Sequence, residues 1–307
     1  MKLLLSLFLI GAATSALAQP SYYALRSQAQ TAYDAKQYQQ AGERFDQAFR
    51  VPKAQPTGSD YYNAACDWAL AGKPTRAFEY LDKAAATDWD NIEHLKQDND
   101  LSSLHADKRW LPLLARMQAA RTRAEAHQNV ALKRELAEIR LLDQGNRSKA
   151  ADLDRRLGPH APGLDSLDRL MEQDDARNLP RVTAIIDKYG WPGKSLVGHA
   201  GSTTAFLVIQ HSNLPTMQKY LPLMREAAAK GELDKSALAL LEDRVLTSQG
   251  KLQIYGSQLR NNPLTGKLEF FPIRDEAHVD ERRASMGLGP LAEYAKGFGL
   301  SYAPAMK

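Results

Sequence analysis

The chain has 307 residues, with 40 Lys and Arg against 36 Asp and Glu and a formal net charge of +4. Charges of both signs are interleaved along the chain, which excludes a nucleic-acid footprint or a polybasic membrane patch. The single cysteine, Cys66, excludes an intramolecular disulfide, so the one large or two ordinary domains that this length allows must be stabilised by packing.

Residues 1–18 predict a cleavable secretory signal. Lys2 supplies a positive charge, residues 3–13 form a short apolar core, and Ala16-Leu17-Ala18 is the small-residue pattern that signal peptidases cleave. The apolar run is shorter than the about 20 residues that a membrane span needs, and no later stretch reaches that length. We therefore expect an exported protein, periplasmic or extracellular, without a membrane span.

Residues 19–118 contain an internal repeat. Two copies lie 36 positions apart, and their matching apolar residues are Ala41 and Ala77, Phe45 and Leu81, and Ala48 and Ala84. Small residues allow two helices to approach closely, and large ones fill the groove between them. The pattern resembles the tetratricopeptide repeat, a helical hairpin of about 34 residues. At the turn between the helices the second copy has Gly72, whereas the first has Lys36.

The segment after the repeats predicts a closing element and a connecting helix. Residues 98–114 resemble the element that often ends such an array. Residues 117–157 predict one long helix that joins the two parts, because apolar residues recur in it at helical spacing, at Leu132, Leu136, Ile139 and Leu142. Within this helix, residues 119–129 are expected to be the linker to a second domain at residues 130–300.

Helix boundaries in the second domain are indicated by capping residues. Gly190 is expected to end a helix, since a glycine followed closely by a proline is a common C-terminal signal. Ser202 is expected to cap a helix over residues 203–211, and Pro215 to begin the next one. Gly231 and Gly250 are expected to stop the two helices that follow.

The end of the domain changes period and predicts a β-hairpin. Residues 251–260 and 267–273 are expected to be its strands, joined by a turn with the sequence NNPLTG. Two short helices are expected near residues 279–286 and 290–296. The predicted fold class is therefore mainly α: tetratricopeptide-like helical hairpins followed by a helical domain with one inserted β-hairpin.

A set of motifs between about residues 130 and 297 resembles the bacterial domain of unknown function numbered 6624. The motifs occur in this order: Asp143-Gln144 with Arg147, residues 187–192 (DKYGWP), Val197-Gly198, residues 206–211 (FLVIQH), 241–245 (LEDRV), 253–258 (QIYGSQ), Pro272-Ile273, 279–288 (VDERRASMGL) and 291–294 (LAEY). Ser257 departs from the more usual threonine, and Asn213 from a more usual acidic residue. The resemblance implies a domain sometimes joined to such repeats, and it implies no reaction.

The polar residues of these motifs are candidates for a site. His211 and Asp243 are candidate catalytic residues, because an aspartate can orient a histidine that acts as general base. The candidate ligand-binding residues are Tyr255, Gln258, Arg244, Arg282 and Arg283; guanidinium groups make bidentate contacts with carboxylates and phosphates. The alternative is that Asp243 and the three arginines form a structural ion-pair network that ties the hairpin to the helices.

Other chemistry is poorly indicated. The seven histidines include no pair at helical i,i+4 spacing and no HExxH motif, so we predict no metal site and no cofactor. No GxSxG motif marks a nucleophilic serine. Cys66 lies among Ala64, Ala65 and Trp68, where a small buried thiol that serves packing is expected.

Two functional hypotheses follow. The preferred one is an exported binding protein, in which the repeats present a groove to a peptide or protein and the C-terminal domain binds a small anionic ligand. The alternative is a cofactor-free hydrolase that acts on an anionic substrate through the C-terminal domain. Whether the protein is an enzyme is left open by the sequence.

Overall fold

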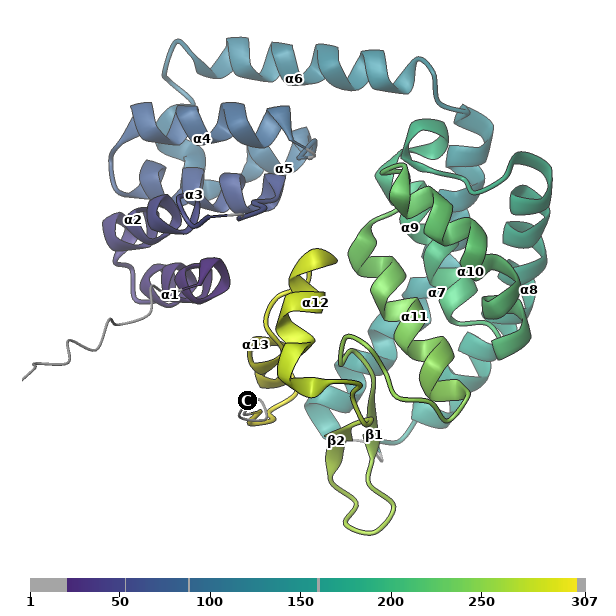
Figure 1. Cartoon of the computed structure of the whole chain (residues 1–307). Coiled ribbons are helices and arrows are strands. Elements are labelled where there is room, and N and C mark those ends of the chain that lie inside the picture. The colour runs from purple at the N-terminus through teal and green to yellow at the C-terminus, as the bar shows by residue number, and fades with distance from the viewer. Residues whose placement is uncertain (1–20, 53, 88, 159–160, 303–307) are drawn as a thin grey trace, which may run out of the picture. The chain divides into compact units, whose positions relative to one another are not determined.

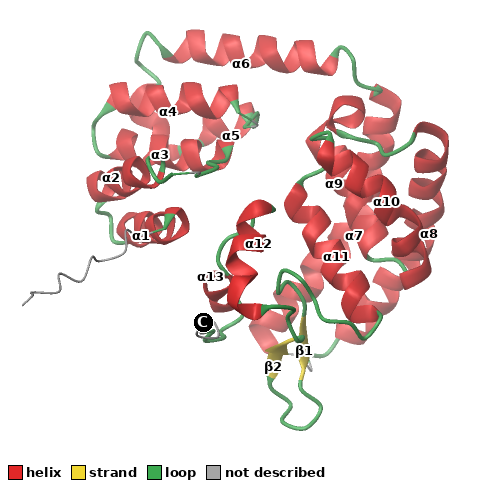
Figure 2. Cartoon of the chain, viewed as in Figure 1, coloured by secondary structure: helices red, strands yellow, loops and turns green. Residues whose placement is uncertain are grey.

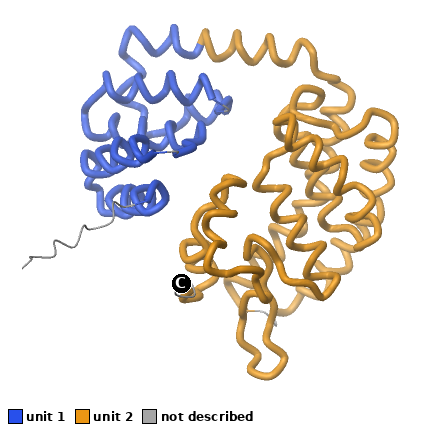
Figure 3. The backbone as a smooth tube through the Cα atoms, viewed as in Figure 1, with its two compact units in different colours: residues 1–114 blue, residues 115–307 orange. Residues whose placement is uncertain are grey.

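The computed structural model describes residues 21–52, 54–87, 89–158 and 161–302 (Figure 1). Apart from one short hairpin, the regular structure of these residues is helical, as predicted (Figure 2). The chain divides into two compact units, residues 1–114 and residues 115–307 (Figure 3). The predicted signal, residues 1–18, lies outside the described residues. No helix in the described ranges is long and apolar enough to cross a bilayer.

Unit 1 consists of two helical hairpins and a short closing segment, residues 92–104. The first hairpin pairs α1 with α2 and the second pairs α3 with α4. The bounds are α1 Tyr22–Asp34, α2 Tyr38–Ala48, α3 Gly58–Leu70, α4 Pro74–Ala86, α5 Ile92–Gln97 and the 3-10 helix η1 Asn99–Leu104.

The repeat positions form the interior of unit 1. Ala41, Ala48, Ala77 and Ala84 are fully buried, which allows the close helix approach that the repeat predicts. The turns of the two copies also have the same backbone conformation, since Gly72 and Lys36 both adopt positive φ angles, of 69° and 58°. Lys36 therefore takes, at some conformational cost, the left-handed backbone that glycine takes freely in the second copy.

The long connecting helix predicted over residues 117–157 is wrong in one respect, because it is two helices. They are α6 Trp110–Glu125, which spans the boundary between the units, and α7 Val130–Leu157. Between them Asn129 caps α7 by accepting a hydrogen bond from the backbone of Leu132. An N-cap residue requires a non-helical backbone, so the helix must break there.

Unit 2 is built on α7, which packs against both α8 and α9, while α10 packs against α11 (Figure 1). Their bounds are α8 Leu164–Tyr189, α9 Lys194–Gln210, α10 Leu214–Ala229 and α11 Lys235–Ser248. The core between them is hydrophobic and includes Leu136, Ile139, Val182, Ile209 and Leu241. The stop signals at Gly190, Gly231 and Gly250 are confirmed, since each glycine follows its helix with a positive φ.

The predicted cap at Ser202 is wrong. Helix α9 begins earlier, at Lys194, and has a kink at Gly198, whose φ is 75°. Ser202 is buried inside the helix, where its hydroxyl donates to the carbonyl of Glu232 and accepts from the indole of Trp191. Its hydroxyl therefore serves tertiary packing.

The hairpin is present but shorter than predicted. Strands β1 Leu259–Asn261 and β2 Leu268–Phe270 pair antiparallel, with Leu259 opposite Phe270. Residues 251–258 form an irregular segment, which meets the second strand region at a bridge between Gln253 and Ile273 and at a hydrogen bond from the Phe271 amide to the Gln258 carbonyl. The remaining elements are the 3-10 helix η2 Glu276–His278, α12 Val279–Ser285 and α13 Leu291–Lys296.

Candidate functional site

Asp243 anchors the irregular segment before β1. It is fully buried on α11, and its carboxylate accepts hydrogen bonds from the backbone amides of Ile254, Tyr255 and Ser257 and from the Ser257 hydroxyl. Amides that bond to a side chain are not available to a strand ladder, which explains the shortened strand. Asp243 therefore does not orient His211, although the sequence predicted that it would.

Arg282 and Arg283 hold the same segment from α12. Arg282 donates to the backbone carbonyls of Ile254 (2.9 Å) and Asp275 (2.9 Å), and Arg283 to those of Tyr255 (2.7 Å) and Gly289 (2.5 Å). Arg283 is only 2% exposed. Both arginines thus tie this segment to α12 through backbone carbonyls, and Arg282 also forms an ion pair with Asp275.

Tyr255 and Gln258 have different surroundings. The Tyr255 hydroxyl donates to Glu242 at 3.1 Å, and burial, followed by the charge of Glu242, raises the pKa of the phenol. The Gln258 amide donates to the Ser257 hydroxyl at 3.1 Å and lines a cavity that His211 and Arg244 share. The structure therefore brings together three of the seven predicted site residues: His211, Arg244 and Gln258.

The acidic partner of His211 is Asp143. His211 caps the C-terminus of α9, and its Nδ1 atom lies 3.0 Å from Oδ1 of Asp143 on α7. Burial would raise the pKa of Asp143, which is 2% exposed, but the hydrogen bonds from His211 and Gln144 and the charge of Arg147 outweigh burial and lower it. Asp143 is accordingly an ionised hydrogen-bond acceptor that fixes the orientation of the imidazole.

A second acid and an arginine complete this polar group. Asp175 on α8 accepts both hydrogen bonds from Nη2 of Arg147, at 2.5 and 2.6 Å, and Nε of Arg147 lies 3.8 Å from Asp143. Ligand atoms of Asp143, Asp175 and His211 lie within 4.8 Å of one another, a spacing that could hold a metal ion. The guanidinium of Arg147 already pairs with Asp175 and lies near Asp143, so a cation would have to compete with it.

Arg244 supplies the positive charge of the cavity. Its Nη1 donates to the carbonyl of Gln210 at 3.3 Å, and its Nε is buried without a hydrogen-bond partner. Within the described residues no carboxylate lies within 4.0 Å of this guanidinium, and burial, followed by the nearby charge of Arg147, lowers its pKa. The cavity has a volume of about 400 Å³ and is lined by Gln210, His211, Ser212, Met217, Arg244, Thr247, Ser248, Gln258 and Phe271.

The match to known families covers this whole site. Residues 131–307 match a family of unknown function (DUF6624). The chain belongs to this family. The match confirms the resemblance inferred from the motifs, and it leaves the helical hairpins of unit 1 outside, so their likeness to tetratricopeptide repeats stays a prediction. No curated protein and no solved structure matches the chain.

Sequence reasoning missed the roles of Asp143 and Asp175. One signal was available for Asp143, because it lies four residues before Arg147 in the first motif and so shares a helix face with it. Nothing in the sequence connects either residue to His211, which lies 68 positions beyond Asp143. For Asp175 we find no sequence signal.

Proposed function

We propose that the protein is an exported binding protein whose C-terminal domain holds a small anionic ligand in the cavity at Arg244. The observation that carries the proposal is the guanidinium itself, half-buried, without a carboxylate partner among the described residues and with an unpaired Nε. A buried cation without a counter-ion is costly, and an anion in the cavity would offset that cost.

The rest of the cavity wall suits a carboxylate or a phosphate group. The Ser248 hydroxyl lines it and can donate a hydrogen bond, as can His211 in its imidazolium form. The Thr247 hydroxyl and the Gln258 amide also line it, and they already donate to the Arg244 carbonyl and to the Ser257 hydroxyl. No aspartate or glutamate contributes to the described lining, so no negative charge there opposes the ligand. Arg244 would make charge-assisted hydrogen bonds, the strongest polar contacts available to an anion.

The experiment is a thermal-shift titration of the whole chain with inorganic phosphate and with citrate, at constant ionic strength set with sodium chloride. At a ligand concentration 100 times the Kd, the expected stabilisation is about 2.7 kcal/mol. Arg244→Gln should abolish the shift. The matched control is Arg181→Gln on α8, which removes an arginine paired with Glu135 and Glu138 and should leave the shift unchanged.

The proposal is wrong if the anions raise the melting temperature of Arg244→Gln as much as that of the wild type, or if neither anion stabilises the wild type. The predicted partner groove of the helical hairpins stays a prediction, as does the signal peptide on which export rests.

A second candidate function is favoured by the bond between Asp143 and His211. A neutral His211 that donates its Nδ1 hydrogen to Asp143 keeps a lone pair on Nε2, and no described residue hydrogen-bonds Nε2. That nitrogen could take a proton from a water whose oxygen attacks a bound ester or phosphoester, and then return it to the leaving group. The domain would then be a cofactor-free hydrolase.

Turnover separates the two functions. Wild-type protein is incubated with p-nitrophenyl acetate and p-nitrophenyl phosphate, and the release of nitrophenol is measured. The hydrolase predicts activity that falls about 10²–10⁴-fold in His211→Gln and falls also in Asp143→Asn. Binding of phosphate without turnover of either ester would support the binding function alone.

A further inference from the structure

Unit 1 contains its own cavity, with chemistry opposite to that at Arg244. Its volume is about 220 Å³, and its lining comes from α1, α2, α3 and the closing segment. Three carboxylates line it, those of Asp67, Asp98 and Asp100, together with the rings of Tyr33 and Tyr62. The described lining residues include no lysine or arginine, and their one basic side chain is His94, whose Nε2 lies 3.5 Å from Asp98.

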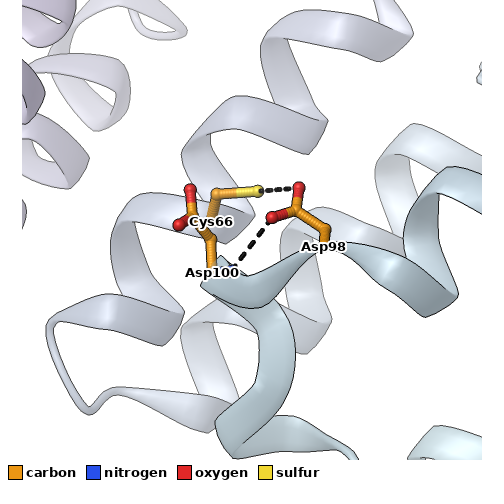
Figure 4. A group of neighbouring side chains, drawn as sticks. All are labelled: Cys66, Asp98 and Asp100. Atoms are coloured by element: carbon orange, nitrogen blue, oxygen red, sulfur yellow. Dashed lines mark hydrogen bonds between the residues drawn. The ribbon is translucent and has the colours of Figure 1, made fainter.

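Two of the carboxylates are held in place by tyrosines from different helices. Tyr62 on α3 donates its hydroxyl to Asp98 at 2.6 Å, and Tyr33 on α1 donates to Asp100 at 2.7 Å. Asp98 also accepts the backbone amide of Asp100 and thereby caps η1. Figure 4 shows Cys66 beside Asp100, with its sulfur directed at Asp98, 3.8 Å from the oxygen.

Asp67 is different because one of its carboxylate oxygens has no hydrogen-bond partner among the described residues. It is 2% exposed, it lines the cavity, and its Oδ2 atom is buried without a hydrogen-bond partner. Burial first, and then the charge of Asp100, raise the pKa of this carboxyl to about 8. Buried carboxylates are normally paired, so an unpaired one in a cavity wall points to a donor that binds there.

We propose that this cavity binds an organic cation, a primary ammonium or guanidinium group, with Asp67 and Asp100 as its counter-ions. An ammonium group carries three donors and no acceptor, and a guanidinium carries five donors, so both match a wall of carboxylate oxygens. Tyr33 and Tyr62 also line the cavity, and aromatic rings can attract a cation. The site is independent of the anion site proposed in unit 2.

A metal ion is the competing occupant, since ligand atoms of Cys66, Asp98 and Asp100 lie within 4.8 Å of one another. The surroundings favour the organic cation. A metal binds the thiolate, whereas burial, followed by the charges of Asp98 and Asp100, raises the pKa of the Cys66 thiol. Both oxygens of Asp98 also already accept hydrogen bonds, from Tyr62 and from the Asp100 amide.

An ammonium or guanidinium group could belong to a free amine or to a lysine or arginine side chain of a peptide. The experiment therefore titrates the whole chain by calorimetry with cadaverine, with agmatine and with the blocked tripeptide acetyl-Gly-Lys-Gly-amide. Binding of at least one probe is expected. Tighter binding of cadaverine or agmatine would support a free amine, and tighter binding of the tripeptide would support a side chain of a partner.

The decisive variant is Asp67→Asn, which keeps the shape and removes the carboxyl that must ionise to pair with the cation. It should weaken binding about tenfold or more, because a buried charge-assisted hydrogen bond is lost. Asp100→Asn is the second variant, in case the first does not fold, and should weaken binding similarly. Asp107→Asn, which removes an aspartate paired with Arg109 outside the cavity, should bind like the wild type.

Three results would overturn the proposal. The first is the absence of binding for all three probes. The second is binding that both Asp67→Asn and Asp100→Asn leave unchanged. The third is zinc chloride that binds the wild type stoichiometrically and displaces the amine, which would make the cavity a metal site.

Discussion

Asp243, Asp143 and Asp67 are all almost fully buried, and they differ in the hydrogen bonds that their carboxyl groups accept. Asp243 is satisfied by backbone amides, Asp143 by an imidazole and an amide side chain, and Asp67 is left with an unpaired oxygen. The same residue type therefore serves architecture, the orientation of a histidine and a proposed ligand site. Only the partner distinguishes these roles.

Asp243→Ala should be among the most damaging substitutions in unit 2. It leaves the amides of Ile254, Tyr255 and Ser257 without their acceptor in a buried segment. We expect a loss of about 3–5 kcal/mol in the free energy of unfolding, measured by urea denaturation. The control, Asp152→Ala, removes a half-exposed aspartate on α7 and should change stability by less than about 0.5 kcal/mol. A loss below about 1 kcal/mol for Asp243→Ala would show that the segment does not depend on it.

The sequence could nominate polar residues for the site but could not pair them. Motif membership selected His211, Arg244 and Gln258, which do line one cavity. It also selected Arg282 and Arg283, whose guanidinium groups bond to backbone carbonyls. A carboxylate that binds amides and one that binds an imidazole look alike in a sequence, because the partner comes from a remote segment of the fold.

The positions of the helices and strands were easier to predict from the sequence than the partners of the polar side chains. The helices of both units follow from apolar spacing and from glycines such as Gly190, whose positive φ ends α8. The failures have local causes. No glycine or proline marks the break between α6 and α7 in the sequence. The strand before residue 259 is shortened because its backbone amides donate hydrogen bonds to Asp243.

For two glycines inside helices, we expect substitution by alanine to change stability in opposite directions. A Cβ atom at Gly42 in α2 would lie 2.6 Å from the ring of Trp68, whereas one at Gly145 in α7 would meet nothing within 4 Å. Gly42→Ala should therefore destabilise unit 1 by about 1–3 kcal/mol through overpacking. Gly145→Ala should stabilise unit 2 by about 0.5–1 kcal/mol, because alanine is the better helix former.

Both variants are measured by urea unfolding of the whole chain, each against the wild type, and each serves as the control for the other. Equal gains in stability for the two would mean that Trp68 moves aside, and the close contact of α2 with α3 would not be needed.

At the scale of the whole molecule, a formal net charge of +4 does not reveal that the described linings of two cavities differ in the sign of their charged residues. The described lining of the cavity at Arg244 contains no aspartate or glutamate, and that of the cavity at Asp67 contains no lysine or arginine. Net charge is a sum over solvated surfaces, so it carries no information about either cavity. Exclusions drawn from composition hold for extended patches and not for small pockets.

The pKa of Asp67 gives the stability of the chain a pH dependence of known sign. An aspartate in the unfolded chain titrates near pH 3.9, while the pKa of Asp67 in the folded protein is about 8. Between these values the folded state holds a proton that the unfolded state has released. Stability is therefore greatest below the lower value and falls as pH rises through the higher one, by at most about 1.4 kcal/mol per pH unit.

Asp67→Asn should flatten this decline between pH 5.5 and pH 7.5, because the amide does not titrate. Unfolding in urea is followed by tryptophan fluorescence, which reports mainly on unit 1, since Trp68, Trp89 and Trp110 all lie in it. Asp107→Asn is the control: hydrogen bonds from Arg109 lower the pKa of Asp107 to about 2, so its contribution is constant above pH 5. Other titrating groups are common to all three proteins and cancel in the difference. Equal slopes for Asp67→Asn and the wild type would mean that Asp67 already has a partner in solution, and the case for an unsatisfied carboxyl in the cavity would fail with it.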